Sequence, residues 1–302
     1  MKPGELNSMT ALTRASASMS RRNWMVRVGT ATLGSAVGLG LYAWQVEPHW
    51  VEVVQRELPI VDLPAKLVGK TLVQLSDLHI GPRVDDNYLI YWFDQVKQWQ
   101  PDIVVLTGDL LTLRSDHSLP VDQMEKVLSH FPQGQLATIG ILGNHDYGRA
   151  FKDPQAADRV VGISRACGIQ MLRNSTHDVE GLQVIGFDDY WGTNFGGASV
   201  LKNVDLDRPS LVLCHNPDVV DLPIWKDYRG WILSGHTHGG QCKLPFTQPS
   251  YLSIRNKRYA QGQIDLEDGR TLYVNRALGH SLQVRFDVRP EITVFKLSRA
   301  SA

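Results

Sequence analysis

The sequence is poor in cysteine and has no excess charge of either sign. Its three cysteines, Cys167, Cys214 and Cys242, have no paired CxxC spacing, which excludes a zinc knuckle and a disulfide framework. We expect buried thiols, and a Cys214–Cys242 disulfide is the alternative for an exported domain. The 31 basic residues balance 31 acidic ones, so no nucleic-acid partner is expected. A length of 302 residues with 43% hydrophobic content predicts one large domain after an N-terminal extension.

An uncharged run near the N-terminus occupies residues 28–44. As a helix its 17 residues would extend roughly 25 Å, slightly less than a bilayer core of about 30 Å. Helices packed on a protein surface usually have a charged face, which this run lacks. We therefore predict a transmembrane or signal-anchor helix over 28–44, uncleaved because no Ala-x-Ala site follows it. The alternative is a disordered tail followed by an ordinary core helix.

The charges around this run predict its orientation. Basic residues precede the run and acidic residues follow it: Lys2, Arg14, Arg21, Arg22 and Arg27 before, Glu47 and Glu52 after. The positive-inside rule then predicts a cytoplasmic N-terminus at the cytoplasmic membrane, with the domain over 45–302 on the outer side. Within the tail 1–27, the segment 20–25 resembles a twin-arginine export signal, with Trp24 in place of the usual Phe.

From about residue 70 onwards, short β-type apolar runs alternate with helical patterns. Strands are predicted at 71–75, 103–107, 136–142, 182–187, 211–214 and 231–233. Apolar residues at helical spacing predict helices over 89–99 and 121–131, and Asp153-Pro154 is typical of a helix N-terminus. The aromatic residues Tyr91, Trp92, Phe93 and Trp99 are expected mostly in the core rather than on a lipid-facing patch. The alternation predicts an α/β layered fold.

Polar clusters come directly after five of these runs. They are Asp77 with His79, Asp109, Asn144 with His145, His215, and His236 with His238. Because ligands bind beyond the carboxyl ends of strands in α/β sheets, we expect these side chains to reach one crevice. The Asp-x-His and His-x-His pairs have the spacing at which an extended chain points two side chains to the same side. A glycine precedes three clusters, at 108, 143 and 235, and is expected to allow a tight turn.

The donor types indicate which metals could bind. Carboxylate and imidazole groups suit borderline divalent ions, so the candidates are Mn, Zn, Fe and Co, whereas a calcium site would contain fewer histidines. Seven candidate donors exceed the three or four protein ligands that one catalytic zinc takes, so we predict two ions bridged by one carboxylate. Two such ions can bind phosphate oxygens and activate water, which is the chemistry of phosphoester hydrolysis.

The ordered blocks Asp77-Leu78-His79, Gly108-Asp109, Gly143-Asn144-His145-Asp146, His215 and Gly235-His236-Thr237-His238 resemble the calcineurin-like metallophosphoesterase superfamily over residues 69–298. The resemblance implies a sandwich of two β-sheets flanked by helices. It also implies that Asp77, His79 and His238 hold one metal and that Asn144, His215 and His236 hold the second. Asp109 would bridge the two ions. His145 would lie near the leaving oxygen, with Asp146 orienting its ring.

Residues 236–241 and 273–276 resemble more closely the bacterial branch that contains the phosphodiesterases YaeI and YkuE. That branch implies an N-terminal signal or anchor and, in some relatives, hydrolysis of UDP-2,3-diacylglucosamine. We therefore expect an enzyme that cleaves phosphodiester or pyrophosphate bonds at a membrane, with a lipid-linked nucleotide as the candidate substrate. Such a lipid is made at the cytoplasmic face, which conflicts with an outward-facing domain.

Two other functions stay open at this point. One is a phosphodiesterase or phosphomonoesterase for soluble extracytoplasmic nucleotides, and the other is a metal-stiffened interaction module without activity. The candidate substrate contacts are Arg83, Gln241, Asn275 and Arg276, although polar residues near a site are more often supports for the ligands.

Overall fold

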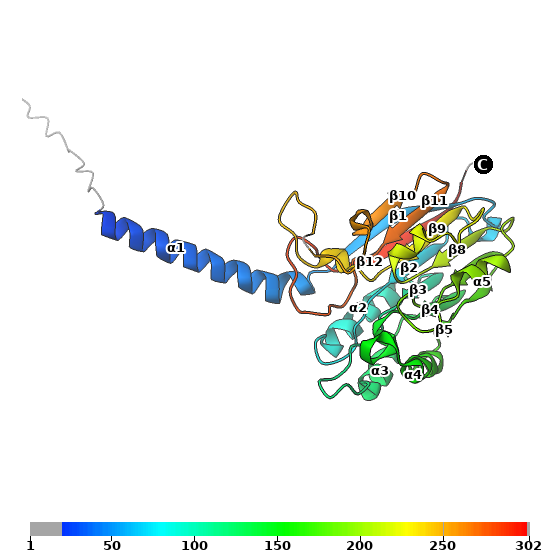
Figure 1. Cartoon of the computed structure of the whole chain (residues 1–302), viewed down its shortest axis with the longest axis horizontal. Coiled ribbons are helices and arrows are strands. Elements are labelled where there is room, and N and C mark those ends of the chain that lie inside the picture. The colour runs from blue at the N-terminus through cyan, green and yellow to red at the C-terminus, as the bar shows by residue number, and fades with distance from the viewer. Residues whose placement is uncertain (1–19, 250, 301–302) are drawn as a thin grey trace, which may run out of the picture. The chain divides into compact units, whose positions relative to one another are not determined.

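A computed structural model describes residues 20–249 and 251–300 of the chain. It divides into two compact units, Met1–Leu41 and Tyr42–Ala302. Figure 1 shows the order of the elements along the chain.

The N-terminal unit contains one helix, α1, over Arg21–Leu41 in the described residues. Ser20 Oγ accepts a hydrogen bond from Asn23 N–H at 3.3 Å, and this explains why the helix begins at Arg21 rather than at residue 28 as predicted. Every residue of α1 is exposed. The predicted segment 28–44 contains four glycines, two threonines and a serine, which keep its hydropathy low. Within 20–249 and 251–300, no helix combines the length and the apolar character needed to cross a membrane, so the predicted span is not supported.

Of the predicted tail, residues 1–19 lie outside the described part of the chain, which begins at the first residue of the twin-arginine-like segment. The paired arginines of that segment form the first turn of α1. After α1 the chain continues in a π-helical turn over Tyr42–Val46.

The first six-stranded sheet of the C-terminal unit has the order β1-β12-β2-β3-β4-β5. Its strands are β1 (Glu52–Ile60), β12 (Glu291–Arg299), β2 (Thr71–Leu75), β3 (Ile103–Thr107), β4 (Ala137–Ile141) and β5 (Gln170–Met171). Strands β2 to β5 run parallel, β12 is antiparallel to β2, and β1 pairs in parallel with β12. The carboxyl ends of β2, β3 and β4 therefore meet at one edge of this sheet.

The second six-stranded sheet has the order β10-β11-β9-β8-β7-β6. Its strands are β10 (Gly262–Asp265), β11 (Arg270–Val274), β9 (Gly230–Ser234), β8 (Ser210–Leu213), β7 (Leu182–Gly186) and β6 (Ser175–Val179). Strands β11, β9, β8 and β7 are parallel, while β10 and β6 form antiparallel edges. In this sheet too, the carboxyl ends of the parallel neighbours β8 and β9 lie side by side.

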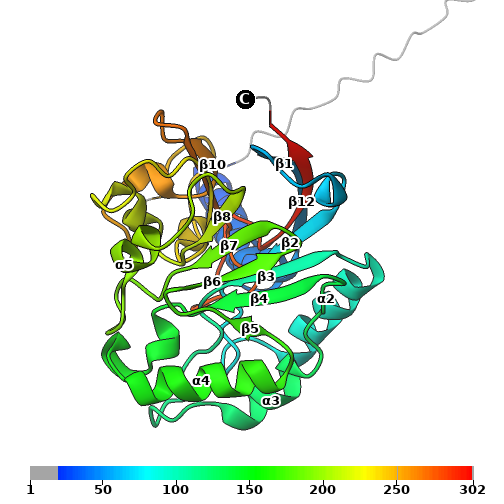
Figure 2. The same ribbon diagram turned by 90° about the vertical axis from the view of Figure 1, so that its right-hand side faces the viewer.

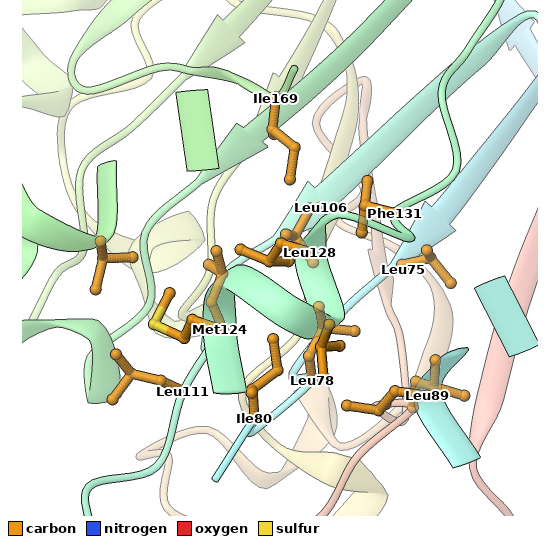
Figure 3. Packing of buried hydrophobic residues seen from close by; sticks show 14 of the residues in the cluster. Leu75, Leu78, Ile80, Leu89, Leu106, Leu111, Met124, Leu128, Phe131 and Ile169 are labelled. Carbon is orange, nitrogen blue, oxygen red and sulfur yellow. The ribbon is translucent and has the colours of Figure 1, made fainter. Parts of the chain in front are cut away.

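Three apolar clusters hold the layers together. The middle cluster contains residues of both sheets, such as Leu72, Ile103, Leu211 and Leu233, and so fills the space between them. A second cluster packs the helices α2 (Asp86–Gln98), α3 (Val121–Leu128) and α4 (Pro154–Ala166) on the outer face of the first sheet. Figure 2 shows these helices along that face, and Figure 3 shows side chains of the cluster around Met124 and Leu128.

The third cluster covers the outer face of the second sheet and includes Val200 and Leu201 of α5 (Gly197–Lys202). The unit is therefore an α/β sandwich of two mixed sheets with helices on both outer faces, as predicted. Short helical turns lie at Glu47–His49, Ala65–Leu67, His145–Tyr147, Arg149–Phe151, Pro217–Asp221, His238–Gly240 and Lys257–Tyr259.

The helix start at Asp153 is confirmed, because its side chain accepts hydrogen bonds from Gln155 N–H and Ala156 N–H. The expectation of a mostly buried aromatic cluster on α2 is only half right. Phe93 is fully buried, but Tyr91 is 56% exposed, and Trp99, which follows the last residue of α2, is 39% exposed.

The three cysteines are free. Cys214 is buried as expected, Cys167 is half-buried and Cys242 is exposed, so neither the expectation of buried thiols throughout nor the alternative Cys214–Cys242 disulfide holds.

Candidate metal centre

The seven predicted metal ligands lie together beyond the carboxyl ends of strands from both sheets. Asp77, Asp109 and Asn144 follow β2, β3 and β4 of the first sheet, while His215 and the His236–His238 segment follow β8 and β9 of the second. All seven are buried, with exposed fractions between 0% and 7%. The expectation that strand ends deliver their side chains to one crevice is confirmed, but two sheets contribute rather than one.

The backbone reaches this arrangement through left-handed turns rather than extended chain. Positive φ angles occur at Asp77 (51°), His79 (50°), Asp109 (52°), His236 (72°) and His238 (51°). The extended-chain explanation for the paired spacing is therefore wrong. Non-glycine residues rarely adopt this conformation, and its concentration here is typical of backbone strain held at a functional site.

The glycine before His236 shows why this turn tolerates no side chain. A Cβ atom at Gly235 would overlap with Ser76 Oγ and Asp77 Oδ2. Likewise, a Cβ atom at Gly143 would overlap with the Asp109 carboxylate and backbone N–H. The prediction that these glycines allow tight turns is confirmed, because at both positions the backbone lies close to a ligand carboxylate.

The donor atoms form two neighbouring clusters. In the first, Asp77, His79 and His238 come together, with His79 Nε2 3.0 Å from His238 Nε2 and His238 Nε2 3.2 Å from Asp77 Oδ1. In the second, Asp109, His215 and His236 come together, with His215 Nε2 3.3 Å from Asp109 Oδ2 and 3.2 Å from His236 Nδ1.

Asp109 also faces the first cluster, because its Oδ2 lies 3.8 Å from His79 Nε2. Asn144 joins the second cluster through Oδ1, which is 3.2 Å from His215 Nε2. The geometry is thus that of two donor groups with one carboxylate between them. His145 forms a third group with His79 and Asp109, so its ring lies close to the same centre.

The charges of the buried groups depend on one another. Burial alone would raise the pKa of Asp77, but His238 and His215 outweigh burial and lower that pKa to about 2. Burial, together with the charges of nearby histidines, lowers the pKa of His79 well below its usual value and that of His236 to about 3. The site therefore offers an ionised Asp77 beside neutral imidazoles at His79 and His236, whereas the charge and hydrogen bond of Asp109 outweigh burial and raise the pKa of His215 well above its usual value.

These residues fit divalent cations by the chemistry of their donors. The Nε2 atoms of His79 and His238 face each other at 3.0 Å, although two neutral imidazole lone pairs repel unless a proton or a cation lies between them. Their other ring nitrogens contact Thr112 Oγ1 and Gln241 Oε1, both at 3.0 Å. Such outer contacts are typical of metal-binding histidines.

Asp146 does not orient the ring of His145, contrary to the prediction. Its Oδ1 accepts hydrogen bonds from Leu110 N–H and Leu111 N–H at 2.8 and 3.2 Å, and its Oδ2 accepts one from Gly143 N–H at 2.8 Å. No hydrogen bond joins it to the His145 ring in the described part of the chain. Asp146 instead ties the loop after β3 to the loop after β4, because a buried carboxylate can satisfy several backbone N–H groups at once.

The donor clusters lie in the wall of a cavity of about 680 Å³. Aromatic and apolar residues that the sequence analysis did not identify complete the wall, among them Phe151, Trp191, Tyr251, Leu282 and Val284. The ring centroid of Trp191 is 4.7 Å from that of His236. One signal in the sequence could have indicated the segment that contains Trp191. Asp188 and Asp189 follow β7 in the same way that the ligands follow their strands, and Trp191 lies two residues further on.

Of the four predicted substrate contacts, Gln241 alone lines this cavity. Arg276 forms ion pairs with Glu291 and Glu52 at 2.5 and 2.9 Å. Asn275 is buried and bonds to Thr293 Oγ1 and Ala277 N–H, while Arg83 contacts the Ser281 carbonyl and lines a separate surface pocket. Substrate contact by these three residues is therefore not supported, because their side chains have other partners.

The fold and the donor set define a metal-binding α/β protein. A family model described as calcineurin-like phosphoesterase matches residues 70–240, more than half of the chain, and the chain belongs to this family. It is therefore a metal-dependent hydrolase of phosphoric esters, and the alternative of an inactive interaction module is wrong.

Several bacterial relatives match nearly the whole chain. It is 30% identical to the uncharacterized metallophosphoesterase YkuE of Bacillus subtilis, over 92% of this chain and 98% of the relative. It is 28% identical to the UDP-2,3-diacylglucosamine pyrophosphatase LpxG of Chlamydia trachomatis, over 88% and 95%. It is also 28% identical to the phosphodiesterase YaeI of Escherichia coli, over 92% and 99%.

Proposed function

We propose that the protein is a binuclear phosphoesterase that cleaves phosphodiester or pyrophosphate bonds. The observation that carries this proposal is the position of Asp109, whose carboxylate faces donor groups on both sides. Asp77, His79 and His238 would hold one ion, Asn144, His215 and His236 the other, and Asp109 both. When bound, such a pair of ions polarises phosphate oxygens and lowers the pKa of a water molecule between them.

His145 is the residue proposed to donate a proton to the leaving oxygen. Its backbone N–H donates to Asp109 Oδ1 at 2.9 Å, which anchors the residue beside the proposed bridge. Its ring lines the cavity, with its centroid 4.9 Å from that of His79 and 5.2 Å from that of Phe151. A half-exposed imidazole beside the reacting phosphate is well placed for general acid catalysis.

The substrate proposed is a lipid-linked nucleotide such as UDP-2,3-diacylglucosamine, on which the relative LpxG is named to act. Exposed apolar side chains at the cavity support this choice: Tyr251, Leu282 and Val284 are 79%, 58% and 41% exposed. Acyl chains could cover such residues and remove their apolar area from water.

A soluble nucleotide is the second candidate, favoured by the aromatic pair Phe151 and Trp191. Their ring centroids lie 6.0 Å apart with planes 30° apart, and Lys152 Nζ holds the two loops together by donating to Trp191 O at 2.5 Å. Such a pair offers a flat surface to a planar ring of the substrate.

Metal-dependent hydrolysis of a panel of substrates tests the proposal. Protein loaded with Mn, Zn, Fe or Co would be assayed on bis-p-nitrophenyl phosphate, p-nitrophenyl phosphate, UDP-2,3-diacylglucosamine and a soluble UDP-sugar. We expect the diester and the diacylated nucleotide to be cleaved best. Preference for the soluble UDP-sugar would favour the second candidate, and preference for the monoester would contradict the proposed bond type.

We also propose that residues 28–44 attach the catalytic unit to the outer side of the cytoplasmic membrane. Support comes from the paired arginines that open α1 and from its uncharged stretch, residues 28–41.

A further inference from the structure

Gln241 joins a candidate metal ligand to a loop at the mouth of the cavity. Its Oε1 lies 3.0 Å from His238 Nδ1 and accepts from Ser281 N–H at 3.3 Å. Its Nε2 donates to Leu282 O at 3.1 Å and to Val284 O at 3.2 Å. We call residues 281–286 the rim loop. One side chain thus bonds in two directions, to the ligand and to the rim loop.

The partners of the Gln241 amide determine which way it points. Leu282 O and Val284 O can only accept, so the amide group facing them must be the –NH₂. Ser281 N–H can only donate, so the group facing it must be the oxygen. Because the same oxygen also faces His238 Nδ1, that ring nitrogen must carry the hydrogen. His238 Nε2 is then left without a hydrogen and points toward Asp77 and His79.

The backbone of Gln241 is held as firmly as its side chain. Gln241 has a positive φ of 56°, a conformation that a non-glycine residue rarely adopts without support. Its N–H donates to His238 O at 3.0 Å, and its carbonyl accepts from Phe286 N–H at 2.9 Å. The rim loop is thereby attached at both the main chain and the side chain of one residue.

We propose that Gln241 is a positioning residue with two separable effects. Its amide oxygen fixes the His238 tautomer that leaves Nε2 free for a metal, and its amide –NH₂ holds Leu282 and Val284 at the mouth of the cavity. The first effect rests on the proposed function only in that His238 holds a metal. The second concerns the rim loop whatever the substrate is.

Two substitutions separate the effects, because each keeps one half of the amide. Gln241→Glu keeps an acceptor for His238 Nδ1–H but offers no hydrogen to the carbonyls of Leu282 and Val284. Gln241→Lys keeps donors for these carbonyls but offers no acceptor to His238. Gln135 provides matched controls, Gln135→Glu and Gln135→Lys, because its exposed amide donates to Gln100 O, and both residues are far in the sequence from His238 and the rim loop.

Two measurements are made on the full-length variants: metal retained after dialysis against graded chelator, and hydrogen exchange of peptides covering 281–286. Gln241→Lys should weaken metal binding by roughly 10–100-fold, the usual effect of losing an outer partner of a ligand, with little change in exchange. Gln241→Glu should retain metal like the wild type but exchange on the order of 5-fold faster in the rim loop. Both control variants should match the wild type.

Wild-type metal retention in Gln241→Lys would overturn the role toward His238. Unchanged exchange in Gln241→Glu would overturn the role toward the rim loop. A failure of the proposed function would look different, because a metal-loaded wild type that cleaves no phosphodiester would still display both effects of Gln241.

Discussion

At the scale of single residues, Asp109 differs from the other candidate ligands because it faces both donor groups. We predict that Asp109→Ala and Asp109→Asn lose both ions, whereas His238→Ala loses mainly one. His238 contacts Asp77 and His79, and its loss leaves the group around His215 complete. Elemental analysis of the purified variants gives the ions per chain.

Asp94→Ala provides the control for this comparison, since Asp94 is exposed on α2 and pairs with Lys97. It should bind metal as the wild type does. Two ions retained by Asp109→Asn would show that the carboxylate does not bridge them.

His145 carries a second prediction, which depends on the leaving group. His145→Ala should retain both ions but lose hydrolysis of alkyl phosphodiesters by roughly 10² to 10⁴-fold, the usual contribution of a general acid. p-Nitrophenolate leaves as a stable anion, so bis-p-nitrophenyl phosphate should be affected much less. The measurement is kcat on the two substrates, with His130→Ala, two residues beyond the end of α3, as the control.

Equal losses on both substrates, with the metal content intact, would contradict proton donation by His145. The ring would then act by stabilising charge in the transition state. A fall in metal content would instead indicate that His145 is a ligand, as its place in a group with His79 and Asp109 would allow.

The ligands could be found from the sequence because each stands directly after a recognisable apolar strand. Their supporting contacts could not, because these join residues far apart in the chain. Asp146, for example, bonds to Leu110 and Leu111 on a different loop, and nothing in its own neighbourhood reveals that. Arg276 similarly pairs with Glu52, a partner 224 positions away.

At the scale of elements, the turn after β9 depends on the absence of a side chain at Gly235. Gly235→Ala should reduce metal retention and lower the thermal midpoint, because the added methyl group would push against Ser76 and Asp77. Gly162→Ala in α4 is the matched control, since nothing lies within 4 Å of the position its Cβ would take. It should be neutral or stabilising by a few tenths of a kcal/mol up to about 1 kcal/mol.

Calorimetry and metal analysis on both variants check this prediction. If Gly235→Ala behaved like Gly162→Ala in both measurements, the close approach of the turn to Asp77 would not matter for the site.

Strands that are buried on both faces were the elements most accurately predicted. The bounds of β2 and β3 agree with the prediction, because Leu72 to Leu75 and Ile103 to Thr107 are buried throughout. In contrast, β1 and β12 were missed. Charged residues such as Arg56 and Lys296 interrupt their apolar residues, and the two strands pair with each other although they are far apart in the sequence.

At the scale of the whole molecule, the candidate ligands come from both sheets, which also meet through apolar packing and through buried hydrogen bonds such as that from Gln74 Nε2 to Ser234 O. Removing the ions should therefore destabilise the catalytic unit as a whole. Ions present at about 1,000 times their Kd stabilise by about 4 kcal/mol, so a chelator should lower Tm by about 8–16 °C. Calorimetry measures Tm before chelation, after chelation and after metal is restored. The Tm of Asp109→Asn should change little on chelation.

The last prediction concerns the side of the membrane on which the catalytic unit lies. Alkaline phosphatase fused after Ala302 should be active in a bacterial host, because basic residues precede the uncharged part of α1 and acidic residues follow it. If the paired arginines act as an export signal, Arg21→Lys with Arg22→Lys should abolish that activity, whereas Arg27→Lys should not. A green fluorescent protein fusion needs cell fractionation, because twin-arginine export carries folded protein. Fluorescence in the cytoplasmic fraction together with silent alkaline phosphatase would reverse the orientation. It would also place the catalytic unit on the face where a lipid-linked nucleotide of this kind is made, and so remove the conflict between the charge pattern and the proposed substrate.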